Sequence, residues 1–176
     1  PGTYTYYSGT APELQVEMGL LGAIVVYPTG FTVTDKRAYD DPSGLDKTTG
    51  SYFDREYLFL VSEMDPNIHQ MVQLGKTEEI DFTESKAVHW FVTGRDGPDT
   101  VAESFHPSLP FQPYGSLARM RIGEYALMRI VGGGKDPHPF HCHGNQHNQI
   151  AREGRVLRSN PTSGPIDLQE SVFPTP

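Results

Sequence analysis

The chain has 176 residues, enough for one ordinary domain and part of a second, and its 36% apolar content predicts a folded protein with a core. Its 18 glycines and 15 prolines are spread along the chain, which indicates many turns rather than disorder. The formal charge is −8, from 14 basic and 22 acidic side chains, without a Lys/Arg cluster, so nucleic acid and anionic membranes are excluded as expected partners.

Two strands are predicted near the N-terminus, over residues 2–7 and 19–27, because both segments are rich in aromatic and β-branched residues. A polar connection that contains proline joins them. Two strands cannot bury a core, so we expect them to complete a sheet whose other strands lie outside this chain. The apolar run 20–27 is far shorter than the roughly 20 residues of a spanning helix, so we expect no membrane span.

Residues 29–50 are rich in Thr, Asp, Gly, Pro and Lys, which predicts a linker or a long surface loop. A second unit is expected over residues 51–176. Thr77–Lys86 could hold a short helical turn, and Glu153-Gly154 is a candidate hairpin turn. Several short strands separated by Pro and Gly favour an antiparallel sandwich or barrel. The strands expected in this unit cover residues 56–61, 88–93, 125–131, 150–152 and 155–157.

Four of the seven histidines, His138, His141, His143 and His147, lie within ten residues. Neutral imidazole is the commonest transition-metal ligand, and side chains two apart in a strand share a face, so His141 and His143 are expected to reach one metal together. Cys142, the only cysteine, would then face the opposite side, and it excludes an internal disulfide. Imidazole with or without thiolate suits copper or zinc rather than calcium or magnesium.

These residues also carry a family resemblance. The HPFHCHG motif (residues 138–144) and the later IAREGR (residues 150–155) resemble the HPxHxHGN and IARDGR patterns of bacterial multicopper oxidases. Residues 1–28 are similar to the closing strands of a preceding cupredoxin domain in that family. The segments 98–100, 112–115, 123–124 and 127–129 are similar to the strands and loops that precede the motif.

The resemblance implies an all-β protein with a cupredoxin-like Greek-key β-sandwich or barrel. Residues 1–28 would be the closing strands of an incomplete first cupredoxin domain. Residues 51–176 would be a second cupredoxin domain that carries the HPFHCHG motif and is itself expected to be incomplete at its C-terminus. Residues 29–50 would link the two.

The resemblance also implies copper ligands, in two alternative alignments. In the HPxHxHG alignment, His138 binds a type 1 copper, and His141 and His143 bind a trinuclear cluster. In the HCHxxxH alignment, Cys142 and His147 bind type 1 copper, and His141 and His143 bind the cluster. The surrounding sequence favours the first alignment, because Arg152 stands where the second would place an axial Met.

The implied function is a multicopper oxidase or a segment of one, which oxidises a small molecule, a metal ion or a redox protein and reduces dioxygen. Such a protein is expected to be secreted, periplasmic or on the cell surface. Residues 6–10 lack the His-x-His that copper-binding first domains carry there. We therefore expect further ligands from other cupredoxin domains or a partner chain, and the chain alone is not expected to be a complete enzyme.

Two other interpretations remain open. The chain could be a non-catalytic cupredoxin-like module for structure or partner binding, with a degenerate copper site. A zinc site at His138, His141 and His143 fits the ligand type but lacks a recognised zinc spacing. The remaining histidines, His69, His89 and His106, are expected to be structural.

Overall fold

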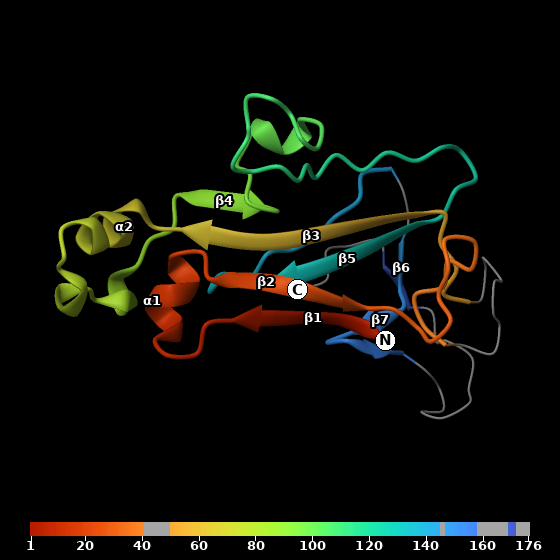
Figure 1. The fold of residues 1–176 in the computed structure, drawn as a ribbon, viewed down its shortest axis with the longest axis horizontal. Helices are drawn as coiled ribbons and strands as arrows, with labels where there is room; N and C mark the ends of the chain where they lie inside the picture. Colours follow the sequence, from red (N-terminus) through yellow and green to blue (C-terminus); the bar gives the residue numbers. More distant parts are fainter. Residues whose placement is uncertain (41–49, 145–146, 158–168, 172–176) are drawn as a thin grey trace.

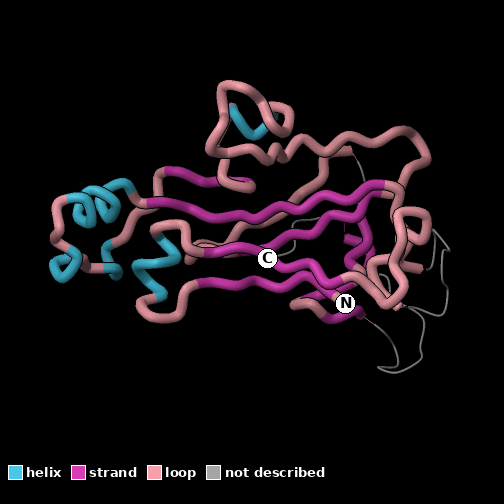
Figure 2. Tube along the Cα trace, viewed as in Figure 1, coloured by secondary structure: helices cyan, strands magenta, loops and turns pink. Residues whose placement is uncertain are grey.

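A computed structural model describes residues 1–40, 50–144, 147–157 and 169–171. The described chain is rich in strands and has few helices, as the all-β prediction requires, and its strands form open sheets. Figures 1 and 2 show the long strands running side by side, with α1, α2 and the short turns of helix that follow α2 gathered at one end. Within these ranges, no helix is both long enough and apolar enough to cross a membrane.

The N-terminal hairpin consists of β1 (Gly2–Tyr7) and β2 (Leu21–Val26), paired antiparallel with Tyr4 opposite Ile24. Both predicted strands are confirmed. Between them, the connection forms the short helix α1 (Pro12–Glu17), which the sequence analysis did not predict. Proline in the first turn, where its missing N–H costs no helical hydrogen bond, was the available signal.

The central sheet has the order β4-β3-β5, built from β3 (Arg55–Met64), β4 (His89–Val92) and β5 (Ala126–Gly132). Strand β4 is antiparallel to β3, whereas β5 is parallel to it, with Gly132 opposite Val61. The parallel pair departs from the purely antiparallel expectation. It arises because the long segment after β4 brings the chain back to the start of β3 before β5 begins.

Helix α2 (Pro66–Gln73) follows β3 directly, and its N-cap Asp65 accepts a hydrogen bond from the backbone of Asn67 at 2.9 Å. An Asp-Pro pair is a typical helix start signal, although the sequence analysis did not predict this helix. The expected helical turn within residues 77–86 occurs as two short 3-10 helices, η1 (Thr77–Glu79) and η2 (Phe82–Glu84). A third, η3 (Asp99–Val101), lies in the segment between β4 and β5.

Two small sheets complete the described chain. Strand β6 (His147–Gln149) pairs with β9 (Gln169–Ser171). Strands β7 (Ala151–Arg152) and β8 (Arg155–Val156) form the predicted hairpin, whose turn residues Glu153 and Gly154 both have positive φ, 51° and 73°. Positive φ at both central residues is the type I′ geometry that matches strand twist.

The described hydrophobic core centres on Ala38, Tyr39 and Phe53. Ala38 and Tyr39 belong to the stretch expected to be a linker, yet they are 0% and 5% exposed. Residues 41–49 of that stretch lie outside the described residues. Partly buried side chains that pack on this core come from both sequence-distant halves: Phe31, Leu127, Ile150, Ala151 and Val156.

Arg129 of β5 joins the N-terminal hairpin to the central sheet. Its Nε donates to Glu56 Oε1 at 2.6 Å and its Nη1 to Thr3 Oγ1 at 2.9 Å. Tyr27 donates its hydroxyl to the other oxygen of Glu56 at 2.6 Å, and its ring lies 5.6 Å from the guanidinium carbon. Because the Arg129 side chain is only 3% exposed, these contacts form in a poorly solvated place where losing one partner is costly.

We expect Arg129→Met to lower the free energy of unfolding by about 3 kcal/mol, since it leaves Glu56 without its cationic partner. The control is Arg55→Met, which removes an exposed pair with Glu124 and should leave stability nearly unchanged. Urea unfolding followed by circular dichroism measures both. Equal midpoints for the two variants would show that Arg129 does not join the hairpin to the sheet.

Candidate metal centre

The HPFHCHG motif follows β5 after a short glycine-rich connection and contains no helix or extended strand. The strand expected across residues 141–143 is therefore not formed. Pro137 and Pro139, which precede these residues, lack the backbone N–H that a ladder needs. The alternation of side chains along a strand therefore does not determine which side chains of the motif meet.

His141 and His143 nevertheless come together. Their ring centroids are 4.7 Å apart with an angle of 72° between the rings, and both residues are exposed. Two imidazoles at this spacing fit two ligands of one ion or of neighbouring ions. Within the described ranges, no group of three His, Cys, Asp or Glu side chains is arranged to hold a metal. The donors present thus fit part of a copper or zinc site, with further ligands required.

His138 has a different partner, the carboxylate of Glu63 near the end of β3. His138 Nε2 lies 2.9 Å from Glu63 Oε2. The Glu63 side chain is 1% exposed and that of His138 is 18% exposed, so the contact is largely shielded from water. A carboxylate hydrogen-bonded to an imidazole is the arrangement that orients histidines in metal sites.

Glu63 is held from its other oxygen as well. The backbone N–H groups of Lys135 and Asp136 both donate to Oε1, the second at 3.1 Å. Burial alone would raise the pKa of this carboxyl, but the hydrogen bonds from His138 and from the two backbone amides outweigh it and hold the pKa below its usual value. Glu63 is therefore a buried carboxylate that remains charged.

The glycines before Lys135 allow this approach. Gly133 N–H donates to the carbonyl of Val61 at 2.9 Å, which continues the parallel pairing one residue past β5. A Cβ on Gly134 would collide with the Glu63 carboxylate, and one on Gly133 would collide with Leu21. The sequence reason for this geometry is therefore the absence of side chains at two consecutive positions.

The two remaining candidates, Cys142 and His147, have separate surroundings. Cys142 is a free, half-buried thiol whose pKa is raised by burial. His147 begins β6, and its ring meets Phe140 edge-on at 6.4 Å between centroids. Its Nδ1 is buried and, among the residues that the structure describes, has no hydrogen-bond partner. Such an atom is suited to an additional ligand.

Sequence reasoning missed Glu63, although one signal was present. Residues two apart in β3 share a face, so Glu63 lies on the same face as Val61 and Phe59. A charged residue that follows apolar Phe59 and Val61 on one strand face indicates a specific buried partner. Its identity could not be read from the sequence, because His138 is 75 positions away.

Lys135 connects this site to the N-terminal segment. Its Nζ lies 3.0 Å from Oε2 of Glu17 in α1, a carboxylate that is 1% exposed. Glu17 Oε1 also accepts the backbone N–H of Asp65 at 2.7 Å. Lys135 thus binds one buried carboxylate through its backbone and another through its side chain.

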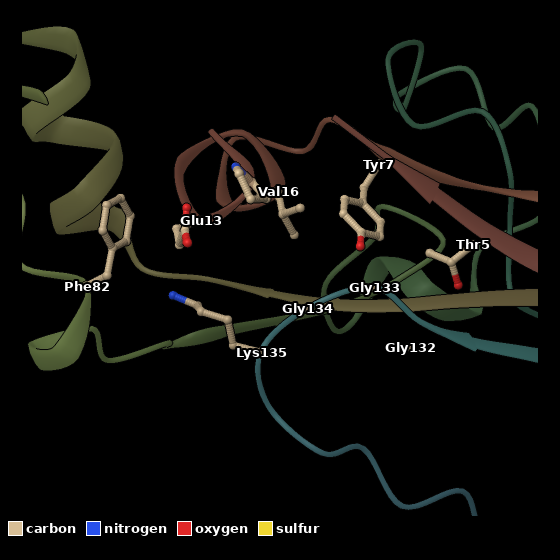
Figure 3. Close-up of a pocket in the computed structure, with 10 residues that line it drawn as sticks. Thr5, Tyr7, Glu13, Val16, Phe82, Gly132, Gly133, Gly134 and Lys135 are labelled. Carbon is tan, nitrogen blue, oxygen red and sulfur yellow. The ribbon is translucent and has the colours of Figure 1, made fainter. Parts of the chain in front are cut away.

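The Lys135 side chain also lines an open cleft of about 360 Å³ between α1, the end of β5 and η2. Figure 3 shows Gly133 and Gly134 beneath Tyr7, with Lys135 extending from them toward Glu13. The cleft offers two aromatic rings, a carboxylate and an ammonium group. It is lined by Thr5, Tyr7, Pro12, Glu13, Val16, Phe82 and residues 132–135.

The other three histidines have protein partners. His69 Nε2 donates to the carbonyl oxygen of Glu17 at 3.0 Å. His89 Nδ1 pairs with Asp96 at 2.6 Å. His106 Nδ1 lies 2.8 Å from the hydroxyl of Ser108. Their surroundings agree with the expectation that they are structural.

We expect Gly134→Ala to destabilise the protein by about 1–3 kcal/mol, because the added methyl displaces the buried Glu63 carboxylate. Gly132→Ala is the matched control, since nothing lies within 4 Å of a Cβ built there. Thermal or urea unfolding of both variants tests this. A Gly134→Ala variant as stable as Gly132→Ala would mean that the carboxylate is not fixed in this position.

Comparison with known proteins found no relative. No family model matches the chain, and neither a curated protein nor a solved structure matches it. Two features of the chain itself make this region a candidate metal centre: the imidazole pair of His141 and His143, and the buried contact between Glu63 and His138.

Proposed function

We propose that this chain is a segment of a multicopper oxidase, in which copper takes electrons singly from a reductant and passes them to dioxygen. The observation that carries the proposal is the exposed pair of imidazoles, His141 and His143, with ring centroids 4.7 Å apart. In this proposal the β-rich scaffold is a cupredoxin-like Greek-key sandwich, and residues 1–28 close a preceding domain.

The roles of the side chains follow from the HPxHxHG alignment. His141 and His143 are ligands of a trinuclear copper cluster, and His138 is a type 1 copper ligand held in orientation by Glu63. The HCHxxxH alternative assigns type 1 copper to Cys142 and His147. The buried Nδ1 of His147, which has no hydrogen-bond partner among the described residues, supports it.

The exposure of His141 and His143 supports a site that is completed from elsewhere. A copper cluster needs more nitrogen ligands than the two that converge here. We propose that other cupredoxin domains, or a partner chain, supply them across an interface. The reductant is a small molecule, a metal ion or a redox protein, and the protein works outside the cytoplasm as a secreted, periplasmic or cell-surface protein.

A second candidate function is a non-catalytic cupredoxin-like module that serves structure or partner binding. One observation favours it: in the described part of the chain, no three potential ligands converge. In that case the HPFHCHG motif is a vestige of a copper site, and the Glu63–His138 contact is retained for stability alone.

We expect the intact protein, with the cupredoxin domains or partner chain that complete the site, to contain copper by elemental analysis. In that protein the double variant His141→Ala/His143→Ala should lose cluster copper and oxygen consumption. Both side chains are exposed, so the free energy of unfolding should change little. The control is His89→Ala/His106→Ala, which removes two histidines whose partners are Asp96 and Ser108. It should retain copper and activity.

Two results would sink the oxidase assignment. One is oxygen-consuming activity that survives loss of both His141 and His143. The other is a protein without copper after reconstitution with Cu(I) or Cu(II), which would favour the non-catalytic module. Stoichiometric zinc in place of copper would favour the zinc site at His138, His141 and His143.

A further inference from the structure

We propose that Glu63 is a positioning residue that fixes the imidazole of His138 in the tautomer with hydrogen on Nε2 and thereby reserves Nδ1 for a metal ion. The tautomer can be tested on the metal-free protein. Only the metal's side of this inference rests on the proposed function.

The contact with Glu63 determines which nitrogen of His138 carries the hydrogen. An ionised carboxylate can only accept hydrogen bonds, so the 2.9 Å contact between Glu63 Oε2 and His138 Nε2 requires the hydrogen to be on Nε2. In a neutral imidazole one nitrogen donates and the other accepts. The accepting nitrogen, and therefore the metal-binding one, must then be Nδ1.

The Glu63 carboxylate is itself held firmly in place. Glu63 Oε1 already accepts the backbone N–H groups of Lys135 and Asp136. The side chain is 1% exposed, and Gly134 packs against it so closely that no Cβ fits there. Rotation of the carboxylate would break these hydrogen bonds in a place that water does not reach. Glu63 therefore presents Oε2 to His138 in a fixed direction.

The Glu63 carboxylate and the His138 imidazole come from different kinds of backbone. Glu63 belongs to β3, whereas His138 lies in an irregular segment between Pro137 and Pro139. Neither proline has a backbone N–H to donate, and the described residues there form no strand that would orient the ring. A contact from the central sheet supplies the orientation instead, which is the role that outer-shell carboxylates have for metal-binding histidines.

The decisive variant is Glu63→Gln. Its amide oxygen still accepts from Lys135 and Asp136, and its NH₂ group then faces His138 as a donor. His138 Nε2 must become the acceptor, so the ring should switch to the tautomer with hydrogen on Nδ1. Nitrogen-15 chemical shifts of the histidine rings, recorded on the metal-free full chain at alkaline pH where imidazoles are neutral, distinguish the two tautomers.

The matched control is Glu17→Gln. Glu17 is equally buried and binds the side chain of the same Lys135, but it does not contact His138. We expect the Nε2-H tautomer of His138 in the wild type and in Glu17→Gln, and the Nδ1-H tautomer in Glu63→Gln. An Nδ1-H tautomer in the wild type, or the same tautomer in Glu63→Gln as in the wild type, would overturn the proposal. The wild-type spectrum decides even if Glu63→Gln does not fold.

Titration with Cu(II) alone separates this inference from the proposed function. Glu63→Gln should weaken copper binding that depends on His138 by roughly 10–100-fold, whereas Glu17→Gln should not. His138→Ala identifies that binding. If the intact wild-type protein, with the domains or partner chain that complete the site, binds no copper while the tautomers switch as expected, the oxidase proposal fails and the positioning role stands. If copper binds equally in wild type and Glu63→Gln, the positioning role fails and the oxidase proposal stands.

Discussion

The described structure around the HPFHCHG motif depends on the hydrogen bonds that the buried Glu63 carboxylate accepts. It receives two backbone N–H groups from the segment after β5 and the imidazole of His138, all in a place from which water is nearly excluded. A buried charge is tolerated only when its hydrogen-bonding capacity is used. The direction of the chain after β5, the glycine at position 134 and the orientation of His138 are therefore consequences of one requirement.

The same region joins the N-terminal segment to the central sheet. Lys135 extends from the segment that binds Glu63 to the buried carboxylate of Glu17, and Glu17 accepts the backbone N–H of Asp65 at the start of α2. At the other end of the hairpin, Arg129 holds Thr3 and Glu56. Residues 1–28 are thus held against the rest of the described chain at two separated points.

The predictable part of this protein is the part encoded by local patterns. The strands β1 and β2 follow from aromatic and β-branched residues, and the turn at Glu153 and Gly154 follows from turn chemistry. The pairing of Glu63 with His138 was not predictable, because it joins positions 75 residues apart. His141 and His143 were predicted to meet by strand alternation, but they meet in an irregular segment. The assignments of His138, His141, His143, Cys142 and His147 as metal ligands all remain predictions.

The separation of Glu63 from His138 also has a consequence for the order of assembly. In the unfolded chain, four histidines and a cysteine lie within ten residues, and nothing there favours one ring nitrogen over the other. Metal ions bind such unfolded clusters and so reduce the benefit of binding to the native state. Selection of Nδ1 begins only when β3 and β5 have paired and Gly134 has reached Glu63. If the proposed function holds, copper delivered after folding would meet an imidazole whose two nitrogens already differ, whereas copper present during folding would compete with the sheet for that imidazole.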